Sequence, residues 1–181
     1  GETPLHWVVR LFDIELKEQY RRDLLYMALA FISHGSDVSI QDKFGNTPLH
    51  LAAQIDDERM IMTLIVARMG DKVILNEALR SKNGRGNTPI HLATISGKRN
   101  TLISCETLNL DPRPVVDGDP EFRLALEAIV DRDTPFHFDI QTVLDKDGNT
   151  PLHIACRFLK VDCVDYLILK DRKEIRHNFN N

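Results

Sequence analysis

The stretch that decides the fold is Gly45-Asn-Thr-Pro-Leu-His-Leu-Ala-Ala53, and close copies begin at Gly1 (GETPLHWVV), Gly86 (GNTPIHLAT) and Gly148 (GNTPLHIAC). Gly allows the positive φ of a tight turn, Thr caps a helix, and Pro suits the first helical position, where no amide donor is needed. The short apolar and Ala residues that follow allow close packing against a neighbour. Recurrence of the phrase predicts a repeat protein in which each copy starts a helix.

This phrase resembles the T-P-L-H-x-A signature of the ankyrin-repeat family, whose unit is a β-turn followed by two antiparallel helices. The linker between Phe31 and His50 agrees with the family pattern, because a helix is predicted to end at Gly35 and an Asp-x-x-Gly turn then leads into the next helix. The same turn recurs in residues 145–148. The resemblance implies an all-α repeat solenoid of stacked helix-turn-helix units with short β-turn or hairpin fingers.

We expect a single ankyrin-repeat domain over residues 1–181, with repeats at about 1–41, 42–82, 83–144 and 145–181. The capping Thr residues of the four phrases are 44, 41 and 62 positions apart, whereas the family unit has about 33 residues. Each interval therefore contains an insertion.

The first two insertions give different predictions. Apolar residues at helical spacing in 15–33 predict a lengthened second helix in the first unit. In the second unit, residues 58–68 supply the second helix, and residues 69–82 form a long link. Within that link, residues 73–79 fit either a short helix or an irregular loop.

The third insertion, residues 111–139, is the main stretch outside the family pattern. It is rich in acidic residues and Pro. Asp119-Pro120-Glu121 is a good helix start, and apolar residues at helical spacing follow it, so we predict an extra amphipathic helix there. The insertion serves either as a contact surface or as a solvated cover over apolar surface.

The last unit is almost free of insertions. Its first helix is predicted at 151–158 and its second at 161–169. In the unit before it, a helix is predicted near 100–108. Residues 170–177 are strongly charged. They fit a polar cap or a frayed tail, and a docking site for an acidic partner is the alternative.

Each phrase holds one His, and histidine is a common catalytic residue and metal ligand. His6, His50, His91 and His153 occupy the same place in separate units, so stacking spaces them along the array instead of converging them on one ion. The resemblance implies that each His bonds the capping Thr and a neighbouring backbone carbonyl. We therefore interpret these residues as structural.

Composition argues against several other classes of protein. A formal net charge of −4 and a pI near 6.0 give no excess of cations for nucleic acid. No apolar run approaches the roughly 20 residues of a membrane span, and the first residues do not resemble an export signal. Cys105, Cys156 and Cys163 form no CxxC pair, so we expect free thiols in a reducing compartment, which is the cytoplasm, with the nucleus or a host cytosol as the alternatives.

We expect no enzyme and no cofactor or metal. Asp131, Asp133, His137 and Asp139 could be drawn as an acid/base or metal group, but no phosphate-binding loop, HExxH or nucleophile elbow accompanies them. Cys156 and Cys163 near His153 could be drawn as a metal cluster, but the two cysteines fall on different predicted helices.

A stacked array has a curved face instead of an enclosed pocket, so we expect a protein-protein interaction module whose partner is another protein and not a small-molecule substrate. The alternative is a substrate-recruiting or targeting domain of a larger enzyme or of a secreted bacterial effector. The resemblance places the contacts at the turn tips and on the facing helices: Lys43, Phe44, Gln54, Ile55, Arg85, Lys146, Asp147, Arg157 and Phe158. Phe44 and Phe158 are candidate aromatic anchors, unless Phe44 packs on its own turn and Phe158 under the last helix.

Overall fold

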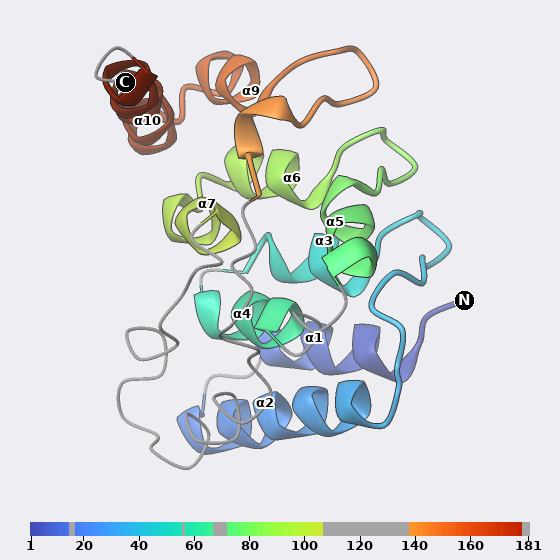
Figure 1. Ribbon diagram of the computed structural model, residues 1–181. Coiled ribbons are helices and arrows are strands. Elements are labelled where there is room, and N and C mark those ends of the chain that lie inside the picture. Colours follow the sequence, from blue (N-terminus) through green and yellow to red (C-terminus); the bar gives the residue numbers. More distant parts are fainter. Residues whose placement is uncertain (15–16, 56, 67–71, 107–137, 179–181) are drawn as a thin grey trace.

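A computed structural model describes residues 1–14, 17–55, 57–66, 72–106 and 138–178 (Figure 1). The elements are α1 (Pro4–Ile14), α2 (Glu18–Ser33), α3 (Pro48–Ala52), α4 (Glu58–Val66), α5 (Lys72–Arg80), α6 (Pro89–Ser96), α7 (Arg99–Glu106), the 3₁₀ helix η2 (Ile140–Thr142), α9 (Pro151–Arg157) and α10 (Val161–Asn178). These residues contain helices and no strand, which confirms the predicted all-α class.

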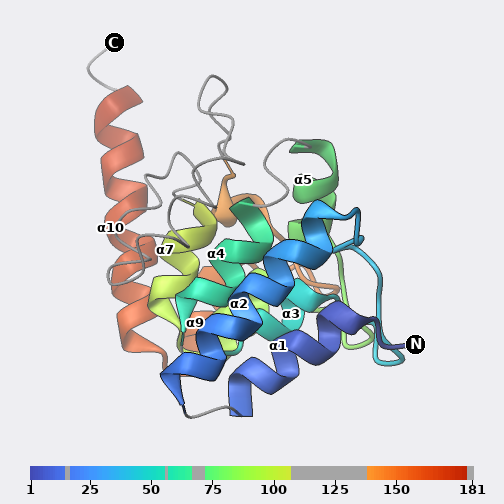
Figure 2. The same cartoon turned by 90° about the horizontal axis from the view of Figure 1, so that it is seen from below.

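The helices stack in two layers (Figures 1 and 2). Helices α1, α3, α6 and α9 form an inner layer in which each contacts the next, and α2, α4, α7 and α10 form an outer layer in the same way. Each inner helix also contacts the outer helix that follows it. The predicted solenoid of helix pairs is therefore confirmed, whereas the repeat boundaries stay a prediction.

The repeated phrase starts each inner helix as its residue types predict. Thr47 is extended, and its hydroxyl accepts a hydrogen bond from the backbone amide of His50. The His50 ring in turn accepts from the Thr47 amide, so the two residues form a capping box around Pro48. Thr150 and His153 repeat the arrangement at α9. Local chemistry thus fixes where α3 and α9 begin, whereas Thr88 at α6 makes no side-chain cap bond to the backbone, although Pro89 is again the first helical residue.

The core runs along the whole stack between the two layers. Helix α4 is its centre, since every residue from Met60 to Val66 is buried. This burial follows from its position, because α2, α3 and α7 all contact it. A fully buried Leu or Ile stabilises the fold by about 2 kcal/mol relative to an exposed one. An outer helix in mid-stack therefore contributes more than its length suggests.

The insertions differ in outcome. Residues 73–79 belong to helix α5, so the helical alternative is correct for the second insertion. The extra helix predicted after Asp119 lies outside the described residues. The predicted end of the last helix at residue 169 is wrong, because α10 continues to Asn178. The segment 170–178 contains neither Gly nor Pro, so no residue in it stops a helix. It is helical and is not a frayed tail.

Candidate functional site: finger loops and inner helices

Three loops lead into α3, α6 and α9 and lie along one edge of the stack (Figure 1). We call residues 41–46, 82–87 and 144–149 the finger loops. In the first, one carboxylate oxygen of Asp42 accepts the amides of Phe44 at 2.8 Å and Asn46 at 2.9 Å. Asp145 does the same in the third loop. Asn83 supplies the equivalent amide oxygen in the second. Each finger is therefore a preformed turn closed by the Asp or Asn side chain at its second position.

The two aspartates that close these turns are buried but ionised. Burial raises the pKa of Asp42, but hydrogen bonds from the amides of Asn46 and Phe44 outweigh it, so the pKa of this carboxyl lies below its usual value. The pKa of Asp145 is lowered in the same way, with burial opposed by hydrogen bonds from Asn149 and Asp147. Both negative charges are thus turned inward and occupied by backbone donors.

Neighbouring fingers are bonded to each other. The Gly84 amide donates to the Phe44 carbonyl at 2.9 Å, and the Lys146 amide donates to the Gly86 carbonyl at 3.0 Å. The approach is so close that a Cβ on Gly45 would lie 2.6 Å from the Gly84 nitrogen. Glycine is needed there because no side chain fits. These bonds fix the spacing of the finger tips, and the sequence reasoning missed them.

Three of the four phrase histidines join successive units below the fingers, as the resemblance implied. His50 Nδ1 lies 2.8 Å from the hydroxyl of Thr47, and Nε2 lies 3.0 Å from the carbonyl oxygen of Asn87 in the next unit. His6 and His91 repeat both contacts, with the carbonyls of Asn46 and Asn149. The expected pair of contacts is therefore confirmed for His6, His50 and His91. His153 contacts only the Thr150 of its own phrase among the described residues.

These contacts also set the protonation state. A carbonyl oxygen only accepts, so Nε2 carries the proton and Nδ1 is left to accept the Thr amide. Burial lowers the pKa of His50 to about 4, against smaller opposing effects of the Asn87 and Ser81 backbone and of Asp42. Burial likewise lowers the pKa of His91. Buried neutral imidazoles of this kind suit a structural link.

Most of the predicted contact residues lie on the surface. Lys43, Gln54, Arg85, Lys146, Asp147 and Arg157 are exposed. Phe44 is 59% exposed, with the Lys43 ammonium 4.9 Å from its ring centre. Phe158 follows α9 and is 44% exposed, so it does not lie under the last helix.

Ile55 corrects the predicted set. It is only 4% exposed and belongs to the core. Helix α3 ends at Ala52, and the Ile55 amide then donates to the Ala52 carbonyl at 3.1 Å in a turn. The side chain consequently points inward instead of continuing the exposed face of a longer helix.

A hollow of about 630 Å³ connects the first two finger loops to the inner helices. Four of the predicted contact residues line it: Lys43, Phe44, Gln54 and Arg85. Arg10, Leu51 and Leu92 also line it. The structure thus brings together the predicted residues of two successive units, while Lys146, Arg157 and Phe158 lie outside this hollow.

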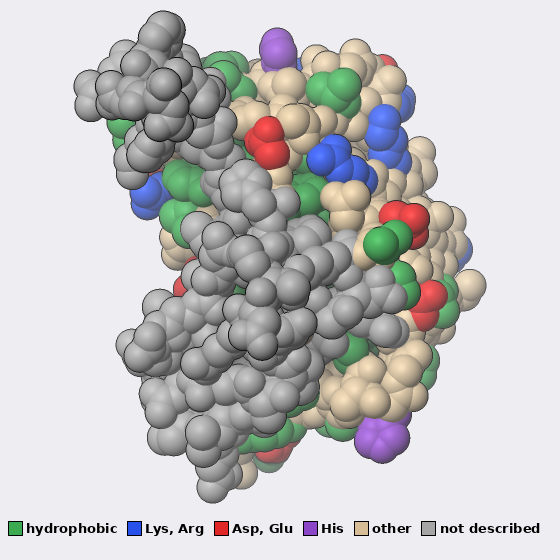
Figure 3. All heavy atoms as spheres, in the orientation of Figure 1, with side chains coloured by type: hydrophobic (Ala, Val, Ile, Leu, Met, Phe, Trp, Pro, Cys, Tyr) green, Lys and Arg blue, Asp and Glu red, His purple; other side chains and the backbone are tan. Residues whose placement is uncertain are grey.

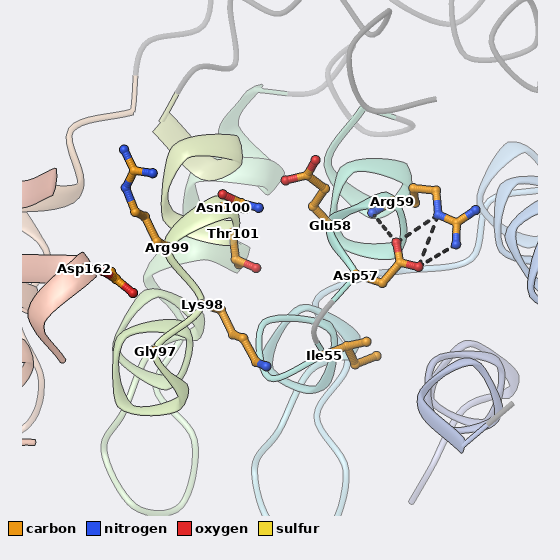
Figure 4. Close-up of a pocket in the computed structure, with 10 residues that line it drawn as sticks. All are labelled: Ile55, Asp57, Glu58, Arg59, Gly97, Lys98, Arg99, Asn100, Thr101 and Asp162. Carbon is orange, nitrogen blue, oxygen red and sulfur yellow. Dashed lines mark hydrogen bonds and ion pairs between the residues drawn. The ribbon is translucent and has the colours of Figure 1, made fainter. Parts of the chain in front are cut away.

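A second hollow, of about 600 Å³, lies where the inner helices pass into the outer ones (Figure 4). Figure 4 shows Glu58 and Asn100 directed toward each other across it. Burial, followed by the charge of Asp57, raises the pKa of Glu58. Arg59 donates to Asp57 from its Nε at 2.9 Å and also binds Glu18 of the preceding unit. Both signs of charge line this hollow, and sequence reasoning did not identify it.

The structure describes some of the residues of the two groups that could be drawn as a metal or acid/base site. Cys156 is exposed on α9, whereas Cys163 is buried on α10. Asp139 caps η2 by accepting the Gln141 amide at 2.9 Å; Asp131, Asp133 and His137 lie outside the described residues. In the described ranges, no group of three or more His, Cys, Asp or Glu residues could hold a metal ion. In the same ranges, no helix combines the length and apolar character of a membrane span.

The chain belongs to the ankyrin-repeat family, a family of protein-interaction modules. Residues 19–105 match the family model of ankyrin repeats in three copies, and residues 125–168 match that of ankyrin repeats in many copies. The all-α solenoid and the Thr-Pro-His helix starts of the repeated phrase agree with both matches.

Particular proteins are similar to parts or most of the chain. The nuclear factor NF-kappa-B p105 subunit of Mus musculus is 30% identical over 127 residues, which cover 67% of this chain and 13% of that protein. The Gallus gallus p105 subunit is 26% identical over 160 residues, covering 85% and 15%. The chain therefore spans only a small part of these relatives. The solved ankyrin-repeat domain of Bcl-3, described as a member of the IkappaB protein family, matches the fold with a TM-score of 0.58 at 21% identity, over 94% of this chain and 57% of that one.

Proposed function

We propose that this chain binds a partner protein across its finger loops and inner helices. The observation that supports the proposal most directly is the hollow beside Phe44, because residues from two successive units line it. An exposed aromatic side chain next to a cation is a type of residue that dominates binding energies when a partner covers it. Lys43 and Phe44 form such a pair at the edge of this hollow.

The rigidity of the finger loops also supports this face. Each turn is closed by an internal side-chain acceptor, and the fingers are bonded to each other. Binding then orders little additional backbone, so less of the interaction energy is lost to conformational entropy. A protein partner also agrees with the similar proteins, because the p105 relatives are named as subunits of a nuclear factor.

A reducing compartment is part of the proposal. The three cysteines are free, and Cys156 is exposed on α9. Exposed free thiols are typical of cytoplasmic and nuclear proteins, in which thiols are kept reduced.

The test is co-purification from a eukaryotic lysate with Phe44→Ala, Arg85→Glu and Arg157→Glu combined. All three residues are exposed, so we expect the free energy of unfolding to change by no more than the roughly 0.5 kcal/mol that surface substitutions cause. A matched control, Tyr20→Ala with Lys17→Glu and Arg22→Glu, makes the same types of change at exposed residues around the start of α2. A partner bound by the parent and the control but not by the finger variant supports the proposal. A partner retained by the finger variant contradicts it.

A further inference from the structure

The finger loops of this acidic chain have an excess of exposed positive charge. The whole sequence has a formal net charge of −4. Yet the exposed charged residues of the three finger loops are Lys43, Lys82, Arg85, Lys146 and a single carboxylate, Asp147. Along the finger edge, exposed positive charge therefore exceeds exposed negative charge.

The other acidic residues of the fingers do not cancel this charge at the surface. The side chain of Asp42 is fully buried, and its carboxylate is occupied by two backbone amides and by Arg10 at 3.4 Å. Asp145 is 6% exposed and is bonded to the amides and the side chain of its own turn. Both carboxylates face inward, so a ligand at the finger tips meets the cations.

These cations are available for a ligand. Within the described residues, none of Lys43, Lys82, Arg85 and Lys146 forms an ion pair with a carboxylate. Lys82 donates to the Asp145 carbonyl at 3.0 Å and is an exposed residue. Figure 3 shows Lys and Arg side chains gathered toward the edge where the finger loops lie in Figure 1.

The hollow beside these cations has an apolar part. Phe44, Leu51 and Leu92 line it together with Lys43 and Arg85. In an extended peptide, successive side chains point to opposite sides, so acidic and apolar residues can alternate between the finger tips and the hollow. The surface fits a ligand that is both acidic and apolar.

We propose that the finger edge binds an extended acidic segment of a partner protein, with Asp or Glu carboxylates against Lys43, Arg85 and Lys146 and an apolar side chain in the hollow beside Phe44. This inference rests on the binding face proposed above and adds the chemistry of the ligand. Complementary charge raises the association rate and discriminates against basic segments.

A protein segment fits better than nucleic acid. A polyanion gains affinity mainly from many cations on phosphates, and single strands also need several aromatic platforms. The three finger loops present one aromatic side chain, Phe44, and the remainder of the chain is acidic. Nucleic acid is therefore an outcome that the test must detect.

The experiment selects ligands from a phage-displayed library of random twelve-residue peptides on the folded chain. We expect the selected peptides to be enriched in Asp and Glu and to contain an aromatic or large aliphatic residue. One selected peptide is then synthesised with a fluorescent label, together with a copy in which Asn and Gln replace Asp and Glu. Binding is measured by anisotropy, with a labelled thymidine oligonucleotide as the nucleic-acid probe.

Lys43→Glu with Arg85→Glu is expected to weaken the acidic peptide at least about tenfold, and raising NaCl from about 50 to about 300 mM to weaken it about threefold or more. Arg22→Glu with Lys17→Glu makes the same change in net charge at the start of α2 and should leave the affinity within about twofold. Unfolding curves of all variants show whether they fold.

The outcomes separate the two proposals. Peptides that lose affinity for Phe44→Ala but bind Lys43→Glu/Arg85→Glu as they bind the parent would leave the binding face intact and overturn the acidic segment. Peptides indifferent to both variants would contradict the face as well. An oligonucleotide that binds more tightly than every peptide, a selection without acidic enrichment, or a library that gives no binder also overturns the inference.

Discussion

Replacing His50 with Ala should break the polar link between the second and third units. His50 is fully buried and makes three contacts: the Thr47 amide at 3.1 Å, the Thr47 hydroxyl at 2.8 Å and the Asn87 carbonyl at 3.0 Å. With a net value of about 1 kcal/mol for each hydrogen bond, the loss is about 3 kcal/mol. In a chain of this size that corresponds to a fall of roughly 6–12 °C in melting temperature.

His153→Ala is the matched control, because it removes the same atoms from the same helical position. His153 is exposed and contacts the hydroxyl of Thr150 at 2.8 Å, but among the described residues no carbonyl of another unit accepts from its Nε2. We expect it to cost about 1 kcal/mol or less, as for a helix cap. Urea and thermal unfolding followed by circular dichroism at pH 7.5 measure both variants. Equal destabilisation by the two substitutions would refute the inter-unit role of the phrase histidine.

Three further predictions use the same unfolding measurements or simple chemistry. The pKa of His50 is about 4 in the folded protein against 6.5 for the ordinary group, so the unfolded chain binds more protons between these two pH values. The free energy of unfolding should therefore fall by up to about 3 kcal/mol as the pH drops from 6.5 to 4. His91, whose pKa is also lowered by burial, should act in the same direction. Urea midpoints that stay constant over that range would contradict it. Gly45→Ala should destabilise by at least about 1 kcal/mol more than Gly148→Ala, because both have positive φ but only Gly45 faces a neighbouring finger; equal unfolding free energies would remove the finger contact as the cause. Cys156 should react alone with iodoacetamide in the folded protein, since it is exposed while burial raises the pKa of Cys105 to about 12 and that of Cys163 as well; intact mass would show two or three adducts if this is wrong.

Much of the fold was predictable because its determinants are local. The Thr, Pro and His of each phrase act within one helical turn, so the starts of the inner helices follow from the residue types. Exposure of Lys43, Phe44 and Arg85 was predictable for a similar reason, since turn tips rarely pack.

What the sequence could not predict depends on lengths and on distances between units. Ile55 was misplaced because α3 is five residues long and stops at Ala52, which no single residue signals. The bond between Gly84 and Phe44 requires two fingers 40 residues apart in the chain to meet, and sequence spacing does not give that separation. The helix through residues 170–178 was missed because charged residues show no apolar periodicity even where they favour a helix.

Two backbone amides in the finger loops are hydrogen-bonded to a carbonyl of the neighbouring finger instead of to their own unit. The Gly84 and Lys146 amides donate across a junction instead of within a helix. Their hydrogen exchange therefore requires two units to separate, whereas helical amides of α6 exchange when that helix opens. Comparing the two rates would tell whether the array loosens first at its junctions or within its helices, and a ligand that spans two fingers would slow the junction amides selectively.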